Sequence, residues 1–356
     1  MLLVSFLLLF ASIFQLLFVI NASAQWIKLP SAEVRSYDIS GFDKIVLTSP
    51  ADVSVRQSDK FSVSARSKYK GALDILKLEL RDRTLYISME QKIFQSFPEH
   101  HVFVTLPILT SLTVHGSGEI ELKGAFVGES LEARIEGSGD MELEEVRLRD
   151  NFSGTLNGSG DLKFKNLAAR NMQLSLHGSG DIEGAHADVF QNADFSIQGS
   201  GTLQMRAVSC ANFSTKLNGS GDNNFRNVAF SENASIELSG SGDINIGKLG
   251  GGRTIATVLR GSGDINFSSV DVEIFDAELY MSGDIFVGAG QAQQVSASVN
   301  GSGDMNLQRM MCKSARVRLQ GSGDIALDVR EVLYMEGVHG SGEVHYTGNP
   351  TLKVKK

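Results

Sequence analysis

One tripeptide, Gly-Ser-Gly, recurs along the chain with a nearly constant period, and this period limits what the chain can fold into. Successive copies are 19 to 21 residues apart. The intact copies begin at Gly116, Gly137, Gly158, Gly178, Gly199, Gly219, Gly240, Gly261, Gly301, Gly321 and Gly340, and a twelfth, degenerate copy is Met281-Ser282-Gly283. Such a period is the signature of a repeat array in which each unit is one supersecondary element. We therefore expect about twelve equivalent units.

The residues around the tripeptide indicate β-strands. An aliphatic residue stands two positions before it in all twelve copies, from Val114 to Val338. After it, apolar and polar residues alternate, as in Leu162-Lys163-Phe164. Alternation with a period of two is typical of half-buried strands. Each repeat is therefore predicted to be a strand, a Gly-Ser-Gly turn, a second strand and a looser segment with one more apolar anchor, such as Val146 or Val208.

A single unit of this kind cannot bury its apolar face, whereas stacked units can. The predicted fold is all-β, a parallel, right-handed β-helix or β-solenoid with about twelve rungs of 20–21 residues. Strand spacing places the rungs about 4.8 Å apart, so the rod is about 55 Å long. Residues 111–349 form this array, residues 25–110 an N-terminal β region that caps it, and residues 350–356 a basic tail.

The first 24 residues differ from the rest. Leu2 to Ile20 is an apolar run, and Ala22-Ser23-Ala24 supplies small residues where signal peptidase cuts. Residues 1–24 are interpreted as an export signal, with an uncleaved membrane anchor as the alternative. We expect an exported protein of the periplasm, outer membrane or cell surface.

Composition narrows the class of partner. Hydrophobic residues make up 42% of the chain, enough for a core, and the formal net charge is −8. Nucleic acid is not an expected partner, because its phosphates require clustered Lys and Arg. A membrane is an expected partner only through the N-terminal segment.

Several segments resemble a known family. They include the repeats Asn157-Gly158-Ser159-Gly160-Asp161 and residues 238–244, the opening strand at 39–45, the Val104-Thr105-Leu106-Pro107 segment and residues 344–350. These segments are similar to the head GIN domain family, described as autotransporter adhesins of bacterial envelopes. The resemblance spans about residues 38 to 351. It implies a surface adhesin and brings no catalytic motif, and the array is longer than a single family domain.

An acidic residue follows the tripeptide in eleven copies and suggests either structural turns or a calcium ladder. The column is Glu119, Asp140, Asp161, Asp181, Asp222, Asp243, Asp264, Asp284, Asp304, Asp324 and Glu343, with Thr202 interrupting it. Calcium-binding β-rolls use nine-residue repeats, unlike the period here. The favoured interpretation is that each Asp accepts hydrogen bonds from nearby backbone N–H groups.

Other candidate residues are interpreted as structural. The serine column, Ser117 to Ser341, has no histidine column beside it, so stacked hydroxyls that bond to the turn or to one another are expected instead of nucleophiles. His100 and His101 form at best a weak exposed metal site. Cys210 and Cys312 share a column but lie five rungs apart, about 24 Å, too far for a disulfide. No catalytic, cofactor-binding or metal-binding residue is predicted.

One outward column carries Asn224, Asn245, Asn266 and Asn306, with Phe286 interrupting it. A long polar face with an occasional aromatic suits an extended glycan, but plain solubility is the slightly favoured interpretation of this column. The leading hypothesis is a non-catalytic envelope or surface protein that binds a polysaccharide or another surface component. The alternatives are a structural, self-associating envelope element and, less favoured, a carbohydrate-active β-helix enzyme, which would need clustered acids in a groove.

Overall fold

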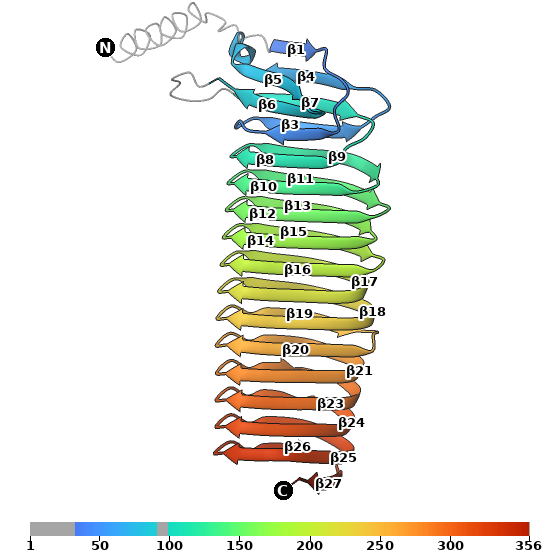
Figure 1. Cartoon of the computed structure of the whole chain (residues 1–356), viewed down its shortest axis with the longest axis vertical. Helices are drawn as coiled ribbons and strands as arrows, with labels where there is room; N and C mark the ends of the chain where they lie inside the picture. Colours follow the sequence, from blue (N-terminus) through green and yellow to red (C-terminus); the bar gives the residue numbers. More distant parts are fainter. Residues whose placement is uncertain (1–32, 91–98, 356) are drawn as a thin grey trace, which may run out of the picture.

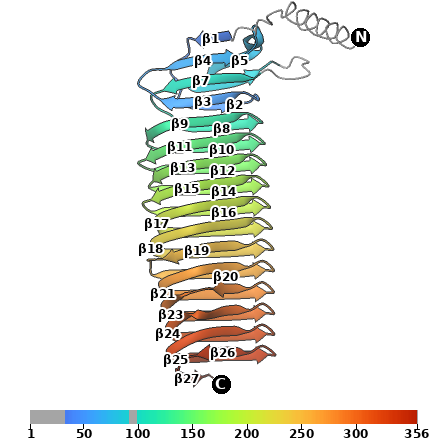
Figure 2. The ribbon, with the colours of Figure 1, turned by 180° about the vertical axis from the view of Figure 1, so that it is seen from behind.

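Each repeat forms one coil of two strands joined by the Gly-Ser-Gly turn. The computed structural model describes residues 33–90 and 99–355, and its coils stack into a rod (Figure 1). The stacking is parallel and in register, so that Ile135 pairs with Leu156 and Leu156 with Leu176. The same stack is seen from behind in Figure 2. The predicted parallel β-solenoid is therefore confirmed.

The strands of the array follow the repeat. They are β8 (Ser111–Gly116), β9 (Glu119–Gly128), β10 (Leu131–Gly137), β11 (Asp140–Leu148), β12 (Asn151–Gly158), β13 (Asp161–Ala169), β14 (Asn171–Gly178), β15 (Asp181–Val189), β16 (Asn192–Gly199), β17 (Thr202–Gly219), β18 (Asp222–Gly240), β19 (Ile244–Gly250), β20 (Thr254–Gly261), β21 (Ile265–Met281), β22 (Ile285–Val287), β23 (Gly290–Gly301), β24 (Met305–Gly321), β25 (Ile325–Gly340), β26 (Val344–Thr347) and β27 (Thr351–Val354).

The core is a set of apolar columns that run along the rod. The aliphatic residues two positions before the tripeptide are at most 1% exposed in eleven coils, and only Val338, near the C-terminal end of the stack, is 43% exposed. Phe195, Phe213 and Phe225 form an aromatic cluster inside, with ring centroids 5.0 to 5.7 Å apart. Burying one such side chain contributes about 1.5–3 kcal/mol. Because each column is continuous, every coil depends on its neighbours for burial.

The segment after the turn is more regular than the sequence suggested. The predicted looser segment continues the strand, as in β13, where Lys165 and Asn166 both face outward before Leu167 turns inward. Two successive outward residues shift the alternation by one position, and this shift bends the strand. The predicted anchors Val146 and Val208 are buried. The prediction of a looser segment after the second strand was wrong, because a one-residue shift of the alternation hides a continuing strand from a strict period of two.

The N-terminal region continues the stack with strands outside the repeat. It contains β1 (Glu33–Tyr37), β2 (Lys44–Leu47), β3 (Asp52–Gln57), β4 (Ser62–Ser67), the 3-10 helix η1 (Ala72–Asp74), β5 (Leu76–Arg81), β6 (Thr84–Met89) and β7 (His100–Leu106). The β2–β3 coil lies between β6–β7 and β8–β9, so the coil order differs from the chain order. Antiparallel β4 and β5 then pair with β7 and β6. They cover a strand edge that would otherwise be open.

Two segments were predicted to lie outside the repeat array, the export signal and the basic tail. The proposed export signal, residues 1–24, falls outside the described residues. Residues 351–354, assigned to the basic tail, form β27 and pair with β25. Within the part of the chain that the structure describes, no helix has the length and apolar character needed to cross a bilayer.

Candidate functional site

The acidic column links neighbouring coils. Asp222 Oδ1 accepts a hydrogen bond from the backbone N–H of Asp243 at 3.2 Å, and Asp243 Oδ1 accepts one from Asp264 at 2.9 Å. The same bond recurs up to Glu343, whose N–H donates to Asp324 at 2.8 Å. These oxygens therefore satisfy backbone donors of the next coil. This arrangement is the structural interpretation that the sequence favoured.

The serine column lies at the exposed tips of the turns and differs from the prediction. The backbone N–H of Ser241 donates to Gly219 O at 2.9 Å, and equivalent bonds join the other turns. Among the described residues, the hydroxyls of this column form no hydrogen bond. The expectation of bonded, stacked hydroxyls was wrong, because the backbone itself spans the gap between coils.

His100 and His101 point to opposite sides of β7, so they do not form the weak exposed site considered from the sequence. His100 is 2% exposed, and its Nε2 lies 2.8 Å from Ala72 O. His101 Nε2 lies 2.9 Å from Ser54 Oγ, and that hydroxyl donates to Glu121 at 3.2 Å. A nucleophilic triad requires the acid to orient the imidazole, whereas Glu121 contacts the serine. This cluster therefore lacks the geometry of a triad.

The cysteines are free and buried. Burial raises the pKa of the Cys210 thiol to about 12, and it does the same for Cys312. A thiol with so high a pKa is a poor nucleophile at neutral pH. Among the residues in the described ranges, no group of three or more His, Cys, Asp and Glu side chains is placed to hold a metal ion.

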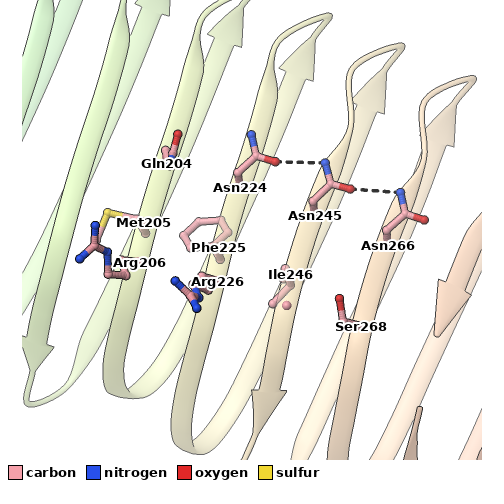
Figure 3. Close-up of a pocket in the computed structure, with 11 residues that line it drawn as sticks. Gln204, Met205, Arg206, Asn224, Phe225, Arg226, Asn245, Ile246, Asn266 and Ser268 are labelled. Atoms are coloured by element: carbon pink, nitrogen blue, oxygen red, sulfur yellow. Dashed lines mark hydrogen bonds between the residues drawn. The ribbon is translucent and has the colours of Figure 1, made fainter. Parts of the chain in front are cut away.

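The asparagine column forms a hydrogen-bonded ladder on the outer surface. Asn245 Nδ2 donates to Asn224 Oδ1 at 3.1 Å, and Asn266 Nδ2 donates to Asn245 Oδ1 at 3.2 Å (Figure 3). Each bond uses one of the two amide hydrogens, so each amide keeps a second hydrogen for a ligand. Phe286 continues the column and is 36% exposed. The ladder fixes the amides at the spacing of the coils, about 4.8 Å.

The ladder borders a hollow of about 420 Å³, here named the Asn groove. It is lined by Gln204, Met205, Arg206, Asn224, Phe225, Arg226, Asn245, Ile246, Gly247, Asn266 and Ser268. Gly247 leaves space where the coil before it carries Arg226. A side chain at Gly247 would not fit without strain, because its Cβ would lie 2.3 Å from Arg226 O. Because the lining residues come from four successive coils, the groove extends along the rod axis.

A second hollow of about 220 Å³ adjoins the Asn groove and shares Gln204 and Arg206 with it. Gly184 and Ala185 line it, where neighbouring coils carry larger side chains. Together the two hollows form a shallow, polar track parallel to the axis. The Asn groove offers amide and guanidinium donors and has no carboxylate or imidazole in its lining. Such a lining can bind and orient a polar ligand.

The sequence pattern indicated the amides of this site but not its arginines. Arg206 and Arg226 lie at the strand bend, as the last outward residues before Ala207 and Asn227 break the alternation. The sequence signal that could have indicated this part of the site is that Arg206, Arg226 and Gly247 occupy equivalent positions in three successive repeats.

The fold and groove together define a repetitive β-solenoid with an axial polar face. The chain belongs to the family described as "Putative auto-transporter adhesin, head GIN domain", whose profile matches residues 41–248 and 223–350. This membership places it among adhesin-like surface proteins. The two matched segments overlap and together cover most of the described chain, in line with an array longer than one family domain.

Solved structures that match this chain include proteins from Bacteroides fragilis and Parabacteroides distasonis. A "putative adhesin" from Bacteroides fragilis is 18% identical and covers 67% of this chain and 97% of its own, with a TM-score of 0.47. A "putative adhesin" from Parabacteroides distasonis is 14% identical and covers 82% and 98%, with a TM-score of 0.44. A "putative lipid binding protein" from the same species is 19% identical and covers 89% and 97%, with a TM-score of 0.33. No curated protein matches the sequence.

Proposed function

We propose that this chain is an exported, non-catalytic surface protein that binds an extended polysaccharide along the Asn groove. The observation that carries the proposal is the axial track, in which hydrogen-bonding amides repeat once per coil. Successive pyranose rings of an extended 1,4-linked chain repeat at close to this spacing, so one polymer can meet equivalent donors on successive coils. Family membership supports a surface role.

The composition of the groove favours binding over catalysis. Glycosidases use a pair of carboxyl groups that flank the bond to be cleaved. The carboxylates closest in sequence to the ladder, Asp222, Asp243 and Asp264, accept backbone N–H groups of the next coil. They are therefore engaged in the stack. A shallow face of amides suits retention of an intact polymer.

The proposal is tested by retention of the purified protein on immobilised polysaccharides, neutral and acidic, with release by the free polymer. Binding is expected to be saturable, and the size distribution of the polymer should not change during long incubation. Shortening of the polymer would point to the carbohydrate-active alternative. Absence of retention on every polymer would contradict the proposal.

The second candidate function is self-association as an envelope element. It is supported by apolar side chains exposed near the C-terminal end of the stack, where Val338, Leu352 and Val354 are 43%, 45% and 66% exposed. Light scattering over a range of concentrations separates the two functions. A constant monomer mass would oppose self-association and leave polymer binding as the function.

A further inference from the structure

We infer that the Asn groove selects an acidic polysaccharide, whose carboxylate groups bind Arg206 and Arg226. This inference rests on the proposed function and specifies its ligand class. Figure 3 shows the two arginine side chains on neighbouring strands, beside the Asn ladder. Both line the Asn groove, and both are exposed.

The two arginines are uncompensated charges within the described structure. Neither forms an ion pair or a side-chain hydrogen bond with a described residue, and the same is true of Lys248, one residue after Gly247. Most arginines elsewhere are paired, as Arg316 is with Glu336 at 2.8 Å. The groove therefore concentrates free cationic donors in a chain whose net charge is −8.

The same outward column carries opposite charges in earlier coils. There, Glu144 lies between Lys123 and Lys165, and Lys165 contacts both Glu142 at 3.0 Å and Glu144 at 3.3 Å. These charges lie around the second hollow, where Lys163 also pairs with Asp161 at 2.9 Å. Lys163 and Lys165, which line that hollow, are thus paired within the protein, whereas Arg206, which lines both hollows, is not paired with any described residue. The change from paired to unpaired cations occurs where the Asn groove begins.

Adjacent like charges favour an external anion. Two guanidinium groups on neighbouring coils repel each other, and they do so more strongly in a less polar environment than in water. A bound anion removes this repulsion and gains charge-assisted, often bidentate, hydrogen bonds. Gly247 leaves room beside Arg226 for such a group. Asp222, four residues before Arg226, accepts a backbone N–H of the next coil, and Glu183, which lines the second hollow with Arg206, forms no ion pair with that arginine.

The combination of donors favours an acidic glycan over other polyanions. Nucleic acid binding requires many cations along the phosphate backbone, whereas here two cations, Arg206 and Arg226, line the groove with a ladder of neutral amides. Amides suit the hydroxyl groups of sugars, and the arginines suit a carboxylate on every ring or every second ring. A uronate-containing polysaccharide supplies both groups at the required spacing.

The experiment compares poly-mannuronate and its carboxyl-reduced, neutral form as ligands of the purified protein, with dextran sulfate as a sulfated comparison that carries no carboxylate. The variants are Arg206→Gln, Arg226→Gln and the double variant. Arg309→Gln is the matched control, because Arg309 is also exposed and unpaired but lies four coils beyond Arg226, outside the groove. Thermal melting confirms that each variant is folded.

We expect poly-mannuronate to bind and the neutral form to bind much more weakly. Each single substitution should weaken binding about tenfold, as expected for a lost charge-assisted hydrogen bond, and Arg309→Gln should leave binding unchanged. Preference for dextran sulfate, with the same dependence on Arg206 and Arg226, would replace carboxylate by sulfate as the recognised group and overturn the uronate assignment. Equal binding of the neutral form, or equal loss with Arg309→Gln, would overturn the inference while leaving the proposed function intact. Failure of every polymer would overturn both.

Discussion

The second glycine of each turn allows the coils to approach closely, and Gly242→Ala tests this feature. A Cβ at Gly242 would lie 1.8 Å from Gly221 O of the preceding coil, whereas Cβ contacts essentially never fall below 3.0 Å. The neighbouring backbone must therefore move by roughly 1 Å. Because the clash is with backbone rather than with a flexible side chain, a rotamer change cannot relieve it.

The magnitude follows from the hydrogen bonds that such a movement would break. The N–H groups of Ser241 and Gly242 both donate to Gly219 O, at 2.9 and 3.1 Å, and the N–H of Asp243 donates to Asp222 Oδ1 at 3.2 Å. Each bond contributes about 1 kcal/mol net. Gly242→Ala should therefore lower the free energy of unfolding by about 3 kcal/mol.

Urea denaturation followed by circular dichroism measures this change, and hydrogen exchange on both sides of the turn shows where the stack opens. Local measurement is needed because a solenoid is held together by nearest-neighbour contacts. Ser241→Ala, at the exposed tip of the same turn, is the control and should change stability by less than about 0.5 kcal/mol. Unfolding of Gly242→Ala at the same urea concentration as the unmodified protein would refute the argument.

Three further predictions concern single positions. Met281 takes the place of the first turn glycine, has a φ of 82° and is 65% exposed. Because a left-handed backbone is unfavourable for a residue with a Cβ, Met281→Gly should raise the free energy of unfolding by about 1 kcal/mol in urea denaturation. A loss of stability would contradict this prediction. Burial, and then repulsion from Glu121 and Asp52, raises the pKa of Glu119, so ionisation of this carboxyl group opposes folding. Glu119→Gln should therefore raise the free energy of unfolding at pH 7, and this gain should disappear as the pH falls below about 4, where the carboxyl group is protonated in both the folded and the unfolded chain. A gain that does not depend on pH would contradict this cause. Asn223 Nδ2 donates a hydrogen bond to Thr215 Oγ1 at 2.7 Å inside the core. Thr215→Val leaves this amide without its partner and should lower the free energy of unfolding by about 1–3 kcal/mol in the same assay, and adding Asn223→Leu should recover most of that loss. Additive losses in the double variant would contradict the coupling of the two residues.

The repeat made most of the fold predictable. The column from Val114 to Val338 showed which side of each strand faces inward, because a period of two leaves one choice of face. The bend after β-strand residues such as Phe164 was not predictable, since Lys165 and Asn166 look like ordinary polar residues in sequence. The position of β2–β3 between later strands was not predictable either, because the N-terminal region lacks the repeat.

The candidate site was partly predictable for the same reason. The asparagines stand out as a column at a fixed distance from the turn. The arginines lie at the bend, where the alternation shifts, and their importance depends on which neighbouring charges are already paired. Only the structure shows that Lys165 is neutralised by Glu142 and Glu144 while Arg206 and Arg226 remain unpaired.

The measurement that tests the central claim most directly is the dependence of affinity on ligand length. Mannuronate oligomers of increasing length are titrated calorimetrically into the purified protein. The Asn groove has one polar ladder position in each of four coils, Gln204, Asn224, Asn245 and Asn266. Affinity is therefore predicted to rise with each added sugar up to at least four units and then to level off. Equal affinity for the monosaccharide and the longer oligomers would contradict binding along the axis, and so would the absence of binding at every length.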